Sequence, residues 1–362
     1  HEYTGTFSHQ KGPKTVFVFM VRPTDGGPWT DPKPFSTLSA ELDSASQFYY
    51  NLSHRQTWFG PKFRNGKTIP RLVVTPVIDL PLASSVYQNN PYAIAAVAKG
   101  IVEGWGGEWA NNGTQDPDNF DRWVIMSNVK MITSTGLAYV GDKVSYGDNS
   151  LSSGVQLHEW GHNWGVVHAN FWTTNTNEPR SSNGIHSEYG DGADMMGGNA
   201  PTMNVLFKER LGFLERARGE VVDITASGMH RLYAHTVHDR RNPTALVRGL
   251  LIPITGYDRG TPQNPNKRIF LGFRHTAGAG GALTRDSWER NAVQLHSDWT
   301  STVFDDNSGS HLLDTSPRSL TTDDRIDAAL KIGRTYSEGP NVNGTSIHGG
   351  FHITPIARGS TN

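Results

Sequence analysis

The feature that most constrains this chain is the stretch from residue 158 to residue 168, which reads HEWGHNWGVVH. His158 and His162 are four residues apart, so on an α-helix the two imidazoles project from the same face about one turn from each other. That spacing lets both rings reach one metal ion at about 2.0–2.1 Å. We therefore expect Val155–Val167 to form a helix that presents a metal site.

The residues around this pair complete a catalytic type of site. Gly165 comes three residues after His162, where a glycine can adopt positive φ and end the helix, and His168 then returns as the third ligand. Three protein ligands with an open fourth position are typical of catalytic Zn²⁺ rather than of closed structural sites. Glu159 is placed to act as the general base that takes a proton from an attacking water. The alternative is an ordinary core helix with packed histidines.

The pattern HExxHxxGxxH resembles the metzincin clan of zinc metallopeptidases. A second segment, YGDGADMMGG at 189–198, resembles the methionine turn of the gametolysin-like family, with Met196 as the turn methionine. The resemblance implies that Met196 forms an apolar floor that positions the histidines. The alternative is a glycine-rich loop with packed methionines. Gly198 stands where astacin- and serralysin-type members have a tyrosine ligand, so that ligand is absent at the usual place.

Further segments extend the resemblance. GLAYVG at 136–141 resembles the metzincin edge strand, which implies that a substrate backbone adds to the sheet there. The residues assigned to substrate binding on this basis are Gly136, Leu137, Ala138 and Tyr139. His186 lies between the third ligand and the predicted turn, where it is expected to line the cleft. Its alternative is an exposed loop histidine. LFKERLGFL at 206–214 resembles the helix that follows the turn.

The hydrophobic pattern predicts an α/β order over the first half of the chain. The predicted strands are Lys14–Val21, Arg71–Leu80, Arg122–Val129 and Gly136–Val140, and the other predicted helices are Ser36–Ser53, Pro91–Glu103 and Asn204–Leu211. A loop is expected from the end of the active-site helix to Gly198. After Glu220, short β-like runs alternate with Gly, Pro and Asn turns.

The length of 362 residues suits two domains. The expected fold class is α/β (α+β): a metzincin-like zinc peptidase domain with a mixed sheet and an active-site helix over 1–215, followed by a mainly β C-terminal domain over 216–362.

Composition excludes some partners. The chain has 33 basic and 34 acidic side chains, so a nucleic-acid or membrane-surface partner is not expected. No apolar run approaches the roughly 18–20 residues that cross a bilayer.

The chain starts at His1 and has no cysteine, which suits a processed, secreted (extracellular) enzyme, expected to be a monomer. Acidic runs such as DPDNFD at 116–121 are candidates for structural Ca²⁺, as the resemblance implies, or are solvated turns.

These observations predict a zinc-dependent endopeptidase that acts on proteins or peptides of the extracellular space. One alternative keeps hydrolysis but narrows the substrate to glycoproteins, mucins or cell-wall glycoproteins. Another, from a different class, is a zinc-bound module that binds glycans or glycoproteins without turnover. The resemblance implies protein hydrolysis and leaves the natural substrate open.

Overall fold

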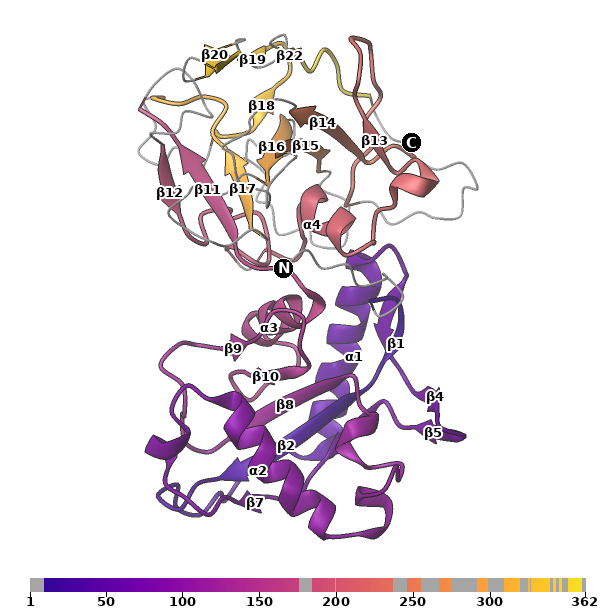
Figure 1. Cartoon of the computed structure of the whole chain (residues 1–362), viewed down its shortest axis with the longest axis vertical. Helices are drawn as coiled ribbons and strands as arrows, with labels where there is room; N and C mark the ends of the chain where they lie inside the picture. The colour runs from indigo at the N-terminus through magenta and orange to yellow at the C-terminus, as the bar shows by residue number, and fades with distance from the viewer. Residues whose placement is uncertain are drawn as a thin grey trace. The chain divides into compact units, whose positions relative to one another are not determined.

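The structure, a computed structural model, describes residues 10–175, 184–198, 200–236, 246–254, 267–274, 292–298, 309–319, 325, 327–338, 341–342, 345–346 and 351–359. This part of the chain has a mixed α/β fold with two main sheets (Figure 1). Its contacts divide it into an N-terminal unit of residues 2–51 and 55–166, and a C-terminal unit of residues 1, 52–54 and 167–362. No helix among the described residues is long and apolar enough to span a membrane.

The N-terminal unit is built on a six-stranded mixed sheet in the order β6-β2-β8-β10-β9, with β7 also paired to β2. Strand β2 runs parallel to β6, β7 and β8, whereas β9 is antiparallel to β10 and lies at the edge. The strand bounds are β2 Val16–Arg22, β6 Leu72–Val74, β7 Ile78–Asp79, β8 Arg122–Ser127, β9 Leu137–Ala138 and β10 Val144–Tyr146. The continuous apolar run of β2 is buried, as expected of a parallel strand covered on both faces.

Two short strand pairs accompany this sheet. They are β1 Gly12–Lys14 with β3 Thr57–Phe59, and β4 Lys62–Arg64 with β5 Lys67–Ile69.

Three α-helices lie in the described part of this unit: α1 Phe35–Leu52, α2 Pro91–Gly104 and α3 Gly154–Trp164. Helix α2 begins with Pro91 and is capped by the Asn90 side chain, which accepts a hydrogen bond from the Ala93 N–H at 3.0 Å. Its apolar face packs into the core cluster that contains Phe17 and Phe19 of β2. Helix α3 carries the histidines and starts at the Ser153 cap.

Aromatic packing holds α3 in place. The Tyr49 ring stacks on Trp164 with 4.1 Å between ring centroids, and Phe59 lies 4.6 Å from Trp160. The Tyr49 hydroxyl donates a hydrogen bond to the Leu157 carbonyl at 2.6 Å. Because Trp160 and Trp164 are almost completely buried, the side of α3 that they occupy is fixed against the core.

The C-terminal unit contains an eight-stranded sheet in the order β12-β11-β17-β16-β15-β14-β13, with β18 also paired to β16. The bounds are β11 Ala169–Thr173, β12 Ile185–Ser187, β13 Val221–Asp223, β14 Gly249–Ile254, β15 Lys267–Phe273, β16 Ala292–Ser297, β17 Ser310–Leu313 and β18 Leu330–Lys331. Two small pairs join β19 Tyr336–Glu338 to β22 Phe351–Ile353 and β20 Asn341–Val342 to β21 Thr345–Ser346. Helix α4 covers Val205–Arg210.

Several elements differ from the sequence-based prediction. The predicted strand Arg71–Leu80 is two strands, β6 and β7, with Pro76 between them, because proline cannot donate a ladder hydrogen bond. The active-site helix ends at Trp164 instead of Val167, because Gly165 adopts φ 112° and terminates it.

The loop predicted between the active-site helix and Gly198 contains two strands, so this prediction is wrong in part. Strand β11 pairs in parallel with β17 and antiparallel with β12. The contacts therefore divide the chain between residues 166 and 167, whereas the sequence places a domain boundary after residue 215. The difference arises because β11 and β12 precede residue 215 but belong to a sheet made mostly of later strands.

Candidate metal centre

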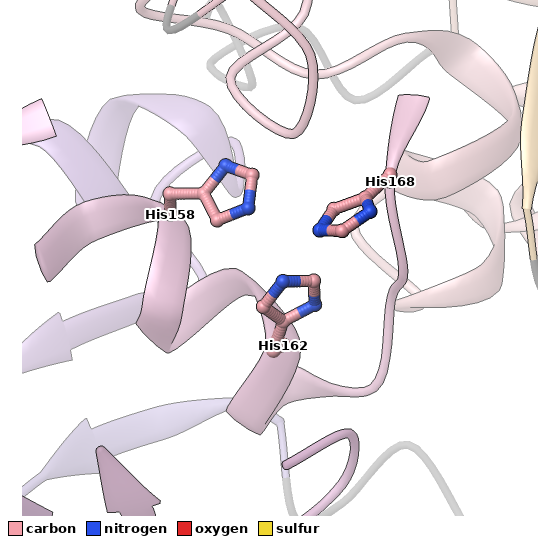
Figure 2. Close-up of side chains that lie close together, drawn as sticks. All are labelled: His158, His162 and His168. Carbon is pink, nitrogen blue, oxygen red and sulfur yellow. The ribbon is translucent and has the colours of Figure 1, made fainter. Parts of the chain in front are cut away.

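Three imidazoles converge at the end of α3. One ligand nitrogen from each of His158, His162 and His168 lies within 4.8 Å of the others. Figure 2 shows the three rings around a common space, two of them from α3 and the third from the residue before β11. His158 and His162 are buried and His168 is partly buried, so this group can hold a metal ion away from bulk solvent.

Hydrogen bonds to the Nδ1 atoms orient two of the rings. His162 Nδ1 lies 2.9 Å from the carbonyl oxygen of Val166, and His168 Nδ1 lies 2.7 Å from Glu188 Oε1. A proton on Nδ1 in these bonds leaves the Nε2 lone pair to face an ion, which is the arrangement that metal-binding histidines use. The donor set therefore fits a divalent transition metal such as Zn²⁺.

The third ligand has further support from its own unit. The Tyr189 ring lies 3.8 Å from the His168 ring, centroid to centroid, and the Tyr189 backbone has φ 59°. A non-glycine residue in the left-handed region is uncommon and persists where its surroundings hold it. Here the Asn170 side chain accepts a hydrogen bond from the Tyr189 N–H at 3.2 Å.

Glu159 lies beside the first ligand on α3 and is buried. Burial raises the pKa of its carboxyl group to about 8. A Cβ placed on Gly136 would lie only 2.3 Å from Glu159 Oε1 and 2.7 Å from a methyl carbon of Val155. The backbone just before β9 therefore passes directly against the carboxylate, where a side chain would not fit.

The other predicted substrate-binding residues surround the edge strand. Leu137 and Ala138 form β9 and are partly buried. The Tyr139 carbonyl accepts a hydrogen bond from Asn163 Nδ2 at 3.3 Å, and the Gly141 N–H donates to the His162 carbonyl at 2.8 Å. These two bonds tie the end of the edge strand to the helix that carries the histidines. Contact with a substrate stays a prediction.

Gly165 and Met196 occupy the places that the sequence suggests. Gly165, with φ 112°, donates hydrogen bonds from its N–H to carbonyls of the last turn of α3. Met196 is fully buried, and its carbonyl accepts a hydrogen bond from the Ala169 N–H at 3.0 Å. Met196 is thus joined by its backbone to the residue next to His168, while its role as an apolar floor stays a prediction.

His186 lies on β12 and is partly buried. Its Nδ1 is 2.9 Å from Nε2 of His311 on β17, and burial lowers the pKa of His186. His186 thus lies on a strand, beside a buried histidine of the same sheet, rather than in an exposed loop. Its part in substrate binding stays a prediction.

The acidic run predicted as a calcium candidate includes Asp116 and Asp118, which lie with Glu103 in a second group of closely spaced carboxylates. Lys99 Nζ lies 2.7 Å from a Glu103 oxygen and 3.1 Å from an Asp118 oxygen. A cation of the protein therefore already lies against these two carboxylates, and bound calcium stays a prediction.

Sequence reasoning did not find Glu188 or His311 as partners of the site, and it named Tyr189 only as the start of the predicted methionine turn. Glu188 and Tyr189 follow the third histidine by about twenty residues, and no local pattern pairs them with it. His311 lies on a strand 125 residues beyond His186. Only the pairing of β11 with β12 and β17 brings these side chains together.

Comparisons with known proteins do not assign the chain to a family. No protein-family model matches it, and neither does any curated protein. One match among solved structures is described as "Structure of a chaperone-substrate complex", at 12% sequence identity and a TM-score of 0.28. The match covers 54% of this chain and 29% of the other, so it spans less than a third of that structure. A similarity of this size carries no argument about fold or function.

Proposed function

We propose that the chain is a zinc-dependent endopeptidase with a metzincin-like catalytic fold. The observation that carries the proposal is the convergence of His158, His162 and His168. Glu159, buried and next to His158 on α3, is the proposed general base. A mixed sheet with an antiparallel edge strand, β9, close to that carboxylate supports it further.

In the proposed peptide hydrolysis, a bound zinc ion and Glu159 have separate roles. A bound zinc ion supplies Lewis-acid chemistry, making water more acidic and polarising the substrate carbonyl. Glu159 takes the proton from the attacking water and returns it to the leaving amine as the C–N bond breaks. Burial gives the Glu159 carboxyl group a pKa of about 8, near neutrality, which suits a group that accepts and returns a proton.

The edge strand supplies the substrate contacts in this proposal. An extended peptide paired with Leu137 and Ala138 would have its scissile bond next to Glu159, because Gly136 already touches that carboxylate. We extend the proposal to proteins or peptides of the extracellular space as substrates and to a secreted, monomeric enzyme. Glycoproteins are included among these substrates.

Replacement of the proposed general base tests the function. The Glu159→Gln variant is expected to bind zinc like the native protein while casein or gelatin cleavage falls by about 10²–10⁴-fold or more. Glu108→Gln, at an exposed position of the same unit, is the matched control and should cleave normally. The proposal fails if E159Q retains full activity, or if the zinc-loaded native protein cleaves nothing in a broad peptide library. The latter result would favour a binding module.

A further inference from the structure

The loop from Tyr189 to Gly198, here called the DGAD loop after its central residues 191–194, contains two completely buried carboxylates. Burial of a carboxylate is costly unless partners compensate it. Both Asp191 and Asp194 belong to the C-terminal unit, and their partners come from that unit's sheet, from the loop itself and from the start of α4. The loop is therefore built around buried polar contacts rather than around solvent-exposed turns.

Asp191 contacts the sheet through its side chain and bonds to other backbone groups through its own main chain. Its Oδ2 lies 2.9 Å from Nε2 of His296 on β16, a residue that is only 1% exposed. Its backbone N–H donates to the Ala169 carbonyl at 3.3 Å, and its carbonyl accepts from the Gly198 N–H at 3.1 Å. Asp191 thus connects β16, both ends of the loop and the first residue of β11.

A second connection comes from the end of β15. Arg274 is completely buried, and its Nη1 donates a hydrogen bond to the carbonyl of Ala193 inside the loop. Asp194 accepts from the Met196 N–H at 2.8 Å and from the Asn204 N–H at 2.6 Å. The loop backbone is therefore bonded at its centre as well as at its ends.

The pKa of Asp191 is consistent with these contacts. Burial by itself would raise the pKa of Asp191, but the hydrogen bond from His296 and the charges of His296 and Arg274 lower it below its usual value. Charge-assisted hydrogen bonds of this kind are stronger than neutral ones.

The loop determines where the third histidine stands. Ala169, the residue after His168, donates from its N–H to the Met196 carbonyl at 3.0 Å and accepts at its own carbonyl from Asp191. Both backbone groups next to the ligand are therefore taken by the DGAD loop. A shift of the loop would therefore move Ala169 and, with it, the adjacent His168.

We propose that His296, Asp191 and Arg274 are positioning residues for the third metal ligand, through which the C-terminal sheet sets the geometry of the three-histidine site. This inference rests on the metal site of the proposed function but not on peptide hydrolysis. It gives the C-terminal sheet a role in the site: β15 and β16 fix the DGAD loop, and the loop fixes the residue that follows His168.

Two variants that differ by one methylene test this in the full chain. In His296→Gln the amide nitrogen can reach the place of Nε2 and donate to Asp191, whereas in His296→Asn it is too short to do so. Zinc affinity is measured by chelator competition. H296Q is expected to stay near the native value, and H296N to lose about tenfold, the lower end of the range for outer-sphere partners. His230→Asn, at an exposed position, is the matched control.

A spectroscopic measurement separates positioning from general stability. The visible spectrum of the cobalt-substituted protein reports ligand geometry, and it should change in H296N but not in H296Q or H230N, at a temperature where circular dichroism shows all three folded. Equal zinc affinity and equal spectra for H296N and H296Q would overturn the proposal. If H296N does not fold, Asp191→Ala, which removes the acceptor, takes its place, and native-like zinc affinity in that variant has the same consequence. Neither readout depends on hydrolysis, so failure here is distinct from failure of the Glu159→Gln test.

Discussion

The contact between Gly136 and Glu159 leads to a sharp prediction about a single methyl group. In Gly136→Ala the new Cβ would lie 2.3 Å from Glu159 Oε1, whereas ordinary van der Waals contact begins at 3.4 Å. The carboxylate oxygen must therefore move by about 1 Å, and the Val155 methyl carbon, at 2.7 Å from the same Cβ, must give way as well. Misplacement of a catalytic group by about 1 Å costs on the order of 10²-fold in rate.

We therefore expect kcat/KM of G136A for a casein-derived peptide to fall about 100-fold. Zinc affinity, measured by chelator competition, should stay near the native value, because no metal ligand is altered. The thermal unfolding temperature should fall modestly, since the Val155 methyl group must be displaced together with the end of the Glu159 side chain.

The matched control is Gly100→Ala on α2. A Cβ at Gly100 would meet no atom within 4 Å, and alanine favours a helix, so G100A should retain full activity. The prediction is wrong if G136A cleaves as fast as G100A. It is also refuted if G136A loses zinc binding and hydrolysis in parallel, since the effect would then not pass through the Glu159 carboxylate.

Two further predictions concern other parts of the chain. Glu188→Ala removes the hydrogen bond to His168, so zinc affinity measured by chelator competition should fall about 10–100-fold. Glu188→Gln keeps an acceptor, so its zinc affinity should fall less. Equal zinc affinities of the two variants would contradict the role of Glu188 as a partner of His168. Burial lowers the pKa of Lys14 from 10.5 to about 8. Between pH 8 and pH 10.5 the unfolded chain therefore binds more protons than the folded chain. The free energy of unfolding should rise by up to about 3 kcal/mol over this pH range. Lys14→Met should remove that gain, and chemical denaturation of both proteins at pH 8 and pH 10.5 measures the difference; identical pH slopes would rule it out.

Local patterns predicted much of the N-terminal unit. The strand predicted at residues 14–21 corresponds to β2, which runs from Val16 to Arg22, and the pattern from residue 36 to residue 53 corresponds to α1 within a residue at each end. Pro91 starts α2 where proline is favoured in a helix. These elements follow from side-chain periodicity and from the fixed backbone of proline, both of which act within a few residues.

The pairing of β11 was not predictable in the same way. Its sequence, ANFWT, is short and lies between glycine- and asparagine-rich segments, so it was expected to be a loop. It becomes a strand because Ala169–Trp172 pair in register with Ser310–Leu313, far along the chain. Strand formation of this kind depends on partners and burial more than on intrinsic preference.

The sequence by itself determined the two helical histidines, the adjacent Glu159 and the turn at Gly165, because a helical repeat and a positive φ are local properties of the chain. Only the tertiary structure decided that Glu188 faces His168 and that His296 holds Asp191 from a strand 105 residues away. Sheet register brings those groups together, and no local pattern encodes it. The residues of the metal site are thus a property of one helix and its turn, while the support of its third ligand is a property of the fold.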